Sequence, residues 1–138
     1  MENYVEWKPF YSVGDAALDN EHKRLLGIVN DLYVAIQMGH EPKRVQEVVE
    51  RLAEYTMSHF DHEERVMRGC GYPNFEAHKA MHDEMRRRAL EFQANPDALT
   101  EHDLLQFVKN WWVRHIQNQD KAYSPYLDAV ARQPVTTA

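Results

Sequence analysis

The chain has 138 residues, of which 43% are hydrophobic and 28% charged, a composition typical of a single globular domain (residues 1–138) with a buried core. Its formal net charge of −6 provides no basic surface, which argues against nucleic acid and against an anionic membrane as partners. Because no apolar run is long enough for membrane insertion, no secretory leader is recognisable and the single cysteine cannot form an internal disulfide, we expect a cytoplasmic protein.

The first 18 residues are predicted to form an extended arm. They are rich in aromatic side chains, and Pro9 and Gly14 oppose helix formation there. We expect the arm to lie across the rest of the chain and to cover apolar surface. A helix capped by Asp15 or Asp19 should follow, because apolar residues then recur every three or four positions. A histidine occupies one place in this stripe, which consists of Leu18, His22, Leu25, Val29, Leu32 and Ile36.

A second helix is predicted from about Pro42 to Arg68, between breaks rich in glycine and proline at 39–42 and 69–73. Residues four apart lie on one face of a helix, so its core face carries a histidine and a glutamate near the C-terminal end. A buried ionised carboxylate costs several kcal/mol unless it is paired or bound to a cation. The predicted core face consists of Val45, Val48, Leu52, Tyr55, His59, Glu63 and Val66.

A third helix is predicted from about Asn74 to Ala94. Two histidines four residues apart lie on its core face, near the N-terminal end. An antiparallel pairing of this helix with the second one would therefore bring both sets of polar side chains to the same height. The predicted core face consists of Phe75, His78, His82, Met85, Ala89 and Phe92, and Met81 is also predicted to fill the core.

A fourth helix is predicted to begin at Thr100, since Asp103 three residues later completes an N-cap signal. Its predicted inner face ends at His115, and Asp120 lies about 140° away from the direction of His115 on an ideal α-helix. Both side chains can reach one site only if the helix ends, unwinds or forms a π-bulge between them. Pro125 should then limit the helix and leave a short tail. The inner face consists of Leu104, Val108, Trp111 and His115, with Trp112 and Ile116 beside it.

Four helices joined by short breaks predict an all-α protein, an up-down-up-down four-helix bundle with an N-terminal extended arm and a short C-terminal helical tail. All four helices then contribute potential metal ligands. Five imidazoles and two carboxylates are more than one tetrahedral zinc ion uses, so we expect two ions that share carboxylates. Ligand count does not identify the metal. The predicted ligands are His22, His59, Glu63, His78, His82, His115 and Asp120.

Several motifs together resemble those of the hemerythrin family. The resemblance covers nearly the whole chain, and the length is similar to that of the single-domain bacterial members. The motifs are Asp19-x-Glu21-His22-Lys23, His59-Phe60-x-x-Glu63-Glu64, His78-x-x-x-His82 and Trp111-x-x-x-His115-Ile116-x-x-x-Asp120-x-x-Tyr123.

The resemblance implies two iron ions in a non-haem centre that binds dioxygen reversibly, for storage, delivery or sensing. It implies that His78, His82 and His115 hold one iron and that His22 and His59 hold the other. It further implies that the irons are bridged by Glu63, Asp120 and an oxo or hydroxo group. We expect a dry apolar ligand pocket, and Trp112 stands where the family often has a smaller aliphatic residue. The predicted wall of this pocket consists of Phe60, Trp111, Trp112 and Ile116.

Other readings of the polar residues lead to other functions. A di-iron oxidase, a peroxidase or a nitric-oxide-handling enzyme could use the same site, and a two-zinc hydrolase or a plain helical interaction domain are further alternatives. We expect no catalytic residue, because a histidine-rich ligand set favours dioxygen binding over activation. Glu64 is predicted to point away from the site, and Arg86, Arg87 and Arg88 to form a solvated surface. His62 is about 60° from the direction of His59 and is predicted to lie at the surface, with a hydrogen bond to the residues around the metal ligands as the alternative.

Overall fold

The computed structural model describes residues 4–38, 42–95 and 99–132, and the elements within these ranges are all helical. None of the helices in these ranges combines the length and the apolar character needed to cross a bilayer. In chain order the elements are the 3-10 turn η1 (Pro9–Tyr11), the helices α1 (Ala16–Gln37), α2 (Pro42–Gly69), α3 (Phe75–Ala94) and α4 (Glu101–Arg114), the π-helical turn η3 (His115–Asp120) and the helix α5 (Lys121–Arg132).

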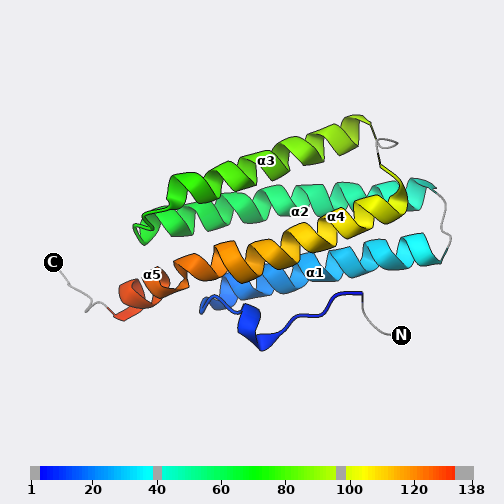
Figure 1. Cartoon of the computed structure of the whole chain (residues 1–138). Helices are drawn as coiled ribbons and strands as arrows, with labels where there is room; N and C mark the ends of the chain where they lie inside the picture. Colours follow the sequence, from blue (N-terminus) through cyan, green and yellow to red (C-terminus); the bar gives the residue numbers. More distant parts are fainter. Residues whose placement is uncertain (1–3, 39–41, 96–98, 133–138) are drawn as a thin grey trace.

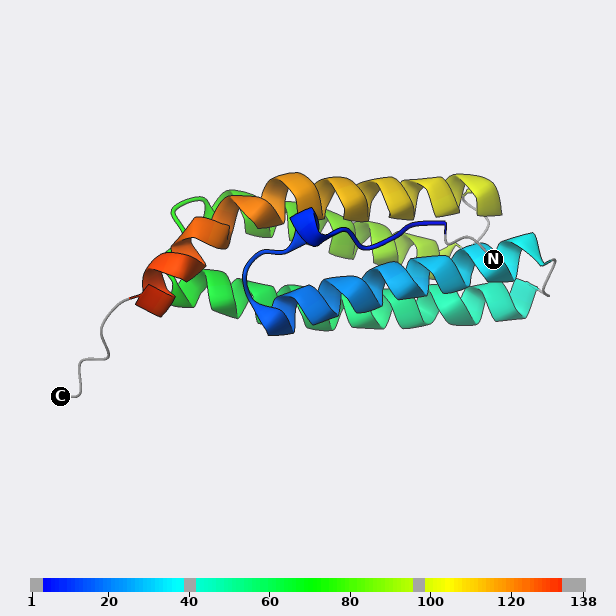
Figure 2. The ribbon, with the colours of Figure 1, turned by 90° about the horizontal axis from the view of Figure 1, so that it is seen from below.

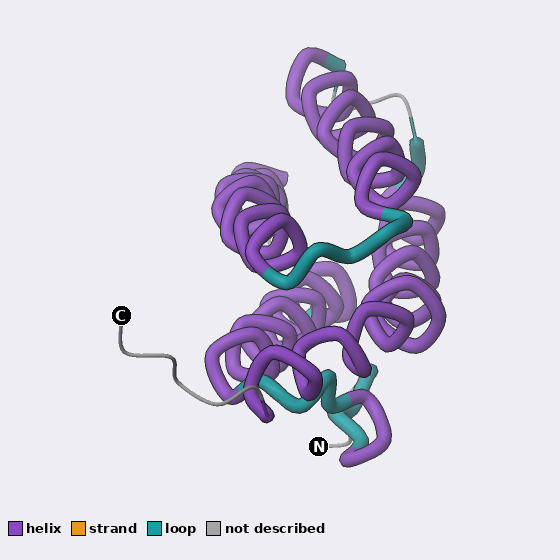
Figure 3. Tube along the Cα trace, turned by 90° about the vertical axis from the view of Figure 1, so that its left-hand side faces the viewer, coloured by secondary structure: helices purple, strands orange, loops and turns teal. Residues whose placement is uncertain are grey.

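The helices α1 to α4 alternate in direction and form the predicted four-helix bundle (Figures 1 and 3). Helix α1 packs against α2 and α4, and α2 packs against α3. The turn between α2 and α3 depends on Gly71, whose φ of 70° is favourable for glycine. There the N–H of Tyr72 donates to the carbonyl of Met67 at 3.1 Å and closes the end of α2. This tight turn sets the C-terminal half of α2 beside the N-terminal half of α3.

The core follows most of the predicted apolar stripes on α1, α2 and α3, although five predicted core residues there are only partly buried, and α4 is rotated relative to the prediction. The five residues are Ile36, Tyr55, Val66, Phe75 and Phe92. Leu105, Val108 and Trp112 are its buried residues, whereas Leu104 and Trp111 are only partly buried. The prediction failed because Leu104 and Leu105 fit the apolar period equally well, and packing against α1 decides between them. Met81 is also 40% exposed, so its predicted place in the core was wrong.

The N-terminal arm lies along α1 and α4, as predicted, and covers part of the core (Figures 1 and 2). Val5 and Val13 are buried, and the amide of Asn30 exchanges two hydrogen bonds with the backbone of Val5 at 2.8 and 2.9 Å. The arm is shorter than expected, because Asp15 caps α1 by accepting from the N–H of Leu18 at 2.9 Å. It also contains the 3-10 turn η1, where a fully extended chain was predicted.

The fourth helix widens into a π-helical turn, η3, between His115 and Asp120. The N–H of Lys121 donates to the carbonyl of Ile116, five residues back, so of the three irregularities considered for this segment the chain forms the π-bulge. The chain then continues as α5, so the prediction that Pro125 limits the helix was wrong. Pro125 lies on the exposed side of α5, where water can satisfy the carbonyl that the proline leaves without a donor.

Candidate metal centre

Seven polar side chains meet in the interior of the bundle. Each is buried, with at most 4% of its surface exposed, and their ligand atoms form two overlapping groups in which all atoms lie within 4.8 Å of one another. The first group contains three histidines and the second contains two, and the same two carboxylates belong to both. The groups are Glu63, His78, His82, His115 and Asp120, and His22, His59, Glu63 and Asp120.

The Glu63 carboxylate turns one oxygen toward each group of histidines. Its Oε1 lies 3.0 Å from Nε2 of His78 and 3.0 Å from Nε2 of His82. Its Oε2 lies 3.1 Å from Nε2 of His59 and 3.3 Å from Nε2 of His22. A carboxylate in this position has one oxygen for each of two neighbouring ions.

The Asp120 carboxylate is arranged in the same way. Its Oδ1 lies 3.0 Å from Nε2 of both His78 and His115, and its Oδ2 lies 3.0 Å from Nε2 of His22. Neither oxygen has a hydrogen-bond partner within the described part of the chain, although both are fully buried. Burial of an ionised carboxylate without a partner costs free energy, so the position of these two oxygens is better explained by bound cations than by the surrounding protein groups.

The histidine rings point their nitrogens at one another across the centre. Nε2 of His115 lies 3.1 Å from Nε2 of His78 and 3.2 Å from Nε2 of His82. Nε2 of His59 is buried near Glu63 without the geometry of a hydrogen bond. Neutral imidazole nitrogens converge in this way around transition-metal ions. The donor set of nitrogen and carboxylate oxygen therefore fits two such ions.

The two carboxylates favour the protonated form of the histidines around them. Burial opposes protonation of His22 and His78, but the neighbouring Asp120 and Glu63 carboxylates outweigh it. They raise the pKa of His22 to about 10 and the pKa of His78 to about 9. Burial also acts against ionisation of Glu63, yet the surrounding histidines hold its pKa well below the usual value. The centre thus attracts positive charge strongly.

Two further carboxylates lie outside the centre and contact the Nδ1 atoms of two of its histidines. Oε1 of Glu21 lies 2.7 Å from Nδ1 of His59, and Oε2 of Glu64 lies 2.9 Å from Nδ1 of His82. The expectation that Glu64 points away from the site was therefore wrong, as was the solvated position predicted for Arg86, which pairs with Glu64 at 2.7 Å. Both glutamates immediately flank predicted ligands in the sequence and belong to the motifs that resemble the hemerythrin family, and these two signals could have revealed them.

Tyr123 is another contact that the predicted ligand set did not include. Its side chain is fully buried, and its hydroxyl donates to Oε2 of Glu63 at 3.0 Å. Burial, together with the charges of Glu63 and Asp120, raises the pKa of Tyr123 well above its usual value, so the phenol keeps its proton. Tyr123 therefore fixes the orientation of Glu63 from the side of α5.

Three of the four predicted pocket residues are fully buried next to the centre, namely Phe60, Trp112 and Ile116. The ring of Phe60 stacks on His82 at a centroid distance of 3.9 Å. Trp111 differs, because it is partly buried and stacks on His115 at 4.4 Å. Its other side faces a surface groove of about 790 Å³ between α3 and α4. His115 lines the same groove beside Trp111, so the groove reaches one of the clustered histidines directly.

The remaining histidines take no part in the centre as far as the structure describes them. His62 is 30% exposed, and its Nδ1 lies 2.6 Å from Oε2 of Glu21, the glutamate that contacts His59. This position corresponds to the alternative considered for His62. His102 is exposed at the start of α4. His40, predicted to be solvated, lies outside the described residues.

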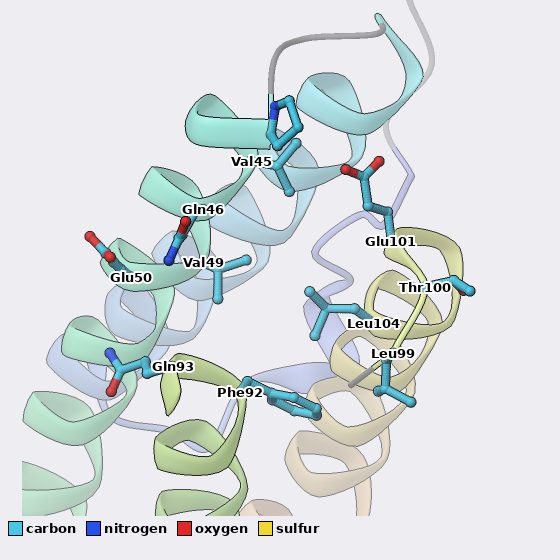
Figure 4. A pocket seen from close by; sticks show the side chains of 11 residues that line it. Val45, Gln46, Val49, Glu50, Phe92, Gln93, Leu99, Thr100, Glu101 and Leu104 are labelled. Atoms are coloured by element: carbon cyan, nitrogen blue, oxygen red, sulfur yellow. The ribbon is translucent and has the colours of Figure 1, made fainter. Parts of the chain in front are cut away.

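A separate pocket lies at the opposite end of the bundle, among the first turns of α2, the last turn of α3 and residues 99–104 (Figure 4). It has a volume of about 380 Å³. Val45 and Val49 face Phe92 and Leu104 across it, as Figure 4 shows. Among the described residues, its lining contains no histidine.

Comparisons with known proteins agree with this geometry. The family described as "Hemerythrin HHE cation binding domain" matches residues 13–127. A bacteriohemerythrin of Pseudomonas aeruginosa (strain LESB58) is 37% identical over 131 residues, which cover 92% of this chain and 82% of the relative. A bacteriohemerythrin of Methylococcus capsulatus (strain Bath) is 33% identical over 114 residues, covering 80% of this chain and 86% of the relative. A crystal structure of wild-type hemerythrin superposes with a TM-score of 0.83 at 30% identity and covers 90% of this chain and 98% of its own.

Proposed function

The chain belongs to the hemerythrin family, and from this premise we propose that it binds dioxygen reversibly at a di-iron centre. The observation that carries the proposal is the pair of overlapping donor groups, which share two buried carboxylates. His78, His82 and His115 would hold one iron, and His22 and His59 the other. Glu63 and Asp120 would bridge the two, since each turns one oxygen toward either group. When bound, the iron pair supplies a reversible two-electron exchange with dioxygen.

Reversible binding requires that water and proton donors are excluded from the bound dioxygen, and we propose that side chains around the centre exclude them. Phe60, Trp112 and Ile116 are fully buried beside the histidines and present apolar surface to them. Tyr123 holds its proton in a hydrogen bond to Glu63, which keeps that proton from moving into the site. We propose that these four side chains protect the bound gas.

We propose a binding protein rather than an enzyme. The donor set is rich in histidine, whereas di-iron oxidases of the ferritin type use mostly carboxylates and Glu-x-x-His pairs. Storage, delivery and sensing of dioxygen are all compatible with this activity, and dioxygen is the proposed partner. We further propose that residues 1–138 make one hemerythrin-like domain and that the protein is cytoplasmic, for which the single free thiol of Cys70 is the support.

The proposal is tested by cycling the iron-loaded, reduced protein between air and vacuum while its visible spectrum is recorded. We expect a charge-transfer band that forms in air, disappears under vacuum and returns over several cycles, with two irons per chain by elemental analysis. A band that forms once and does not reverse, together with consumption of peroxide or of an added substrate, would support an enzyme instead. A colourless protein that contains zinc would support a hydrolase.

A further inference from the structure

Two of the five clustered histidines are held by a carboxylate from behind, one in each group of histidines. Glu21 on α1 reaches His59 on α2, with Oε1 2.7 Å from Nδ1. Glu64 on α2 reaches His82 on α3, with Oε2 2.9 Å from Nδ1. Since Nε2 of each ring faces the centre, Nδ1 must carry the proton when Nε2 binds a metal, and Nδ1–H then donates to the glutamate.

The two glutamates have different neighbours. Glu64 pairs with the guanidinium of Arg86 at a distance of 2.7 Å. The same guanidinium pairs with Asp61 and Asp83 and lies 5.3 Å from the ring centroid of Phe60. A guanidinium is always charged, so Glu64 has a permanent cationic partner, which it shares with Asp61 and Asp83.

No lysine or arginine pairs with Glu21 within the described residues. Its second oxygen, Oε2, instead lies 2.6 Å from Nδ1 of His62, an imidazole on the surface side of the site. The side chain of Glu21 is 22% exposed. The negative charge of Glu21, next to His59, is therefore neutralised less by nearby cations than the negative charge of Glu64, next to His82.

A carboxylate that accepts the Nδ1–H bond of a metal-binding imidazole makes the ring a stronger donor to the metal. A stronger donor favours the more highly charged oxidation state, whereas a nearby fixed cation weakens the effect of the carboxylate. The two outer glutamates should consequently differ in how strongly each favours oxidised iron.

We propose that Glu21 is a positioning residue that sets the redox potential of the centre through His59, and that Arg86 suppresses the matching effect of Glu64 on His82. This inference rests on the proposed function, because it assigns His59 and His82 to the two irons. Glu21 and Arg86 lie outside the proposed ligand set, and they would control how readily the iron-loaded protein loses electrons.

The potential of the iron-loaded protein, measured by spectroelectrochemistry, tests the proposal. Glu21→Gln keeps the shape and an acceptor but removes the charge, so it should change the ratio of oxidised to reduced iron at a fixed potential by about tenfold, a rise of about 59 mV. Glu64→Gln should raise the potential by less than half as much. Arg86→Met, which keeps packing on Phe60, should lower the potential, and adding Glu64→Gln to it should reverse that change.

Glu84→Gln is the matched control, because Glu84 is an exposed glutamate on α3 whose ion pairs within the described residues are with Arg87 and Arg88. It should leave the potential unchanged. Equal shifts for Glu21→Gln and Glu64→Gln, or an unchanged potential in Arg86→Met, would overturn the proposal.

A second measurement on the unmodified chain keeps the inference separable from the dioxygen proposal. In the zinc-loaded protein, proton NMR should show the Nδ1–H signals of His59 and His82 farther downfield than those of the other clustered histidines, with the His59 signal the farther of the two. The opposite order would contradict the inference even if dioxygen binds reversibly. If dioxygen does not bind but the His59 signal is farther downfield than the His82 signal, the proposed function fails. The inference that Glu21 acts on His59 more strongly than Glu64 acts on His82 then still stands.

Discussion

At the scale of single residues, the protein depends on polar side chains placed where apolar ones are usual. A buried histidine normally finds a hydrogen-bond partner, but here the Nδ1 atoms of His22 and His78 are buried without one in the described part of the chain. Asp120 is fully buried, and both of its carboxylate oxygens also lack a hydrogen-bond partner within the described residues. These groups destabilise the metal-free fold, so we infer that ion binding compensates for them.

Replacement of His78 tests this residue-scale argument. Nε2 of His78 lies 3.0 Å from both Glu63 and Asp120, near the middle of the cluster. His78→Ala should lose at least one of two irons and lower the thermal midpoint, because metal binding is coupled to folding. His102→Ala removes an exposed histidine and serves as the control for iron content and midpoint. Unchanged iron content in His78→Ala would contradict its assignment as a ligand.

Trp112 is predicted to control access to the centre. It is fully buried beside Phe60 and His59, and its indole N–H has no acceptor within the described residues. Trp112→Leu should leave a cavity that admits water, with several-fold faster autoxidation, unchanged iron stoichiometry and a loss of stability of about 1–3 kcal/mol.

The rate of loss of the dioxygen-bound spectrum in air measures this effect. Trp7→Leu is the matched control, since Trp7 is a partly buried indole on the N-terminal arm, packed against Tyr11. If both variants autoxidise at the rate of the unmodified protein, Trp112 does not guard the pocket.

At the scale of secondary structure, the π-helical turn η3 decides whether His115 and Asp120 share a site. On a regular α-helix, residues five apart differ by about 140° in direction, and residues four apart by about 40°. The wider turn in η3 brings the fifth residue back to the face of the first. The same turn carries Tyr123 on α5 into contact with Glu63.

The register of this turn can be changed on its exposed side. Insertion of one alanine after Asn118 should rotate Asp120 away from His115 and reduce iron to less than two per chain. Deletion of Asn118 should retain both irons, because the aspartate then lies four residues after His115 on a regular α-helix. Asn118→Ala preserves the length and is the control. Full iron content in the insertion variant would show that the register of η3 is not required.

At the scale of the whole molecule, the centre joins elements that few other polar contacts connect. Its ligands come from α1, α2, α3 and η3, and Tyr123 adds α5. Around it, one large apolar cluster fills the bundle and a smaller one lies where α5 meets the turn between α2 and α3. Bound ions would therefore act as cross-links between all helices of the bundle.

Removal of the metal should accordingly weaken the whole fold. The chelated protein should unfold at a lower temperature and at a lower urea concentration than the iron-loaded one, with the slope of the urea transition unchanged. Added ferrous iron or zinc should restore stability by about 2.7 kcal/mol at a concentration one hundred times the dissociation constant. Calcium, which prefers oxygen ligands, should not. Equal stability of the two forms would exclude a structural contribution of the metal.

The sequence by itself determined the helices, the bundle and the inward position of the seven polar side chains. Apolar residues at helical spacing leave His59 and Glu63, or His78 and His82, on the face that must avoid water, and this local periodicity needs no knowledge of the partner helices. It also showed that His115 and Asp120 need an irregular turn, although not which kind. That these side chains bind iron stays a prediction.

Only the tertiary structure decided which neighbours surround the centre. The contacts of Glu21 with His59 and of Glu64 with Arg86 join different helices, and no helical period relates the partners. The rotation of α4 was likewise undetermined, because Leu104 and Leu105 satisfy one apolar period equally and only packing against the other helices distinguishes them. Side-chain contacts between helices depend on rotation and height, which the pattern along a single helix does not contain.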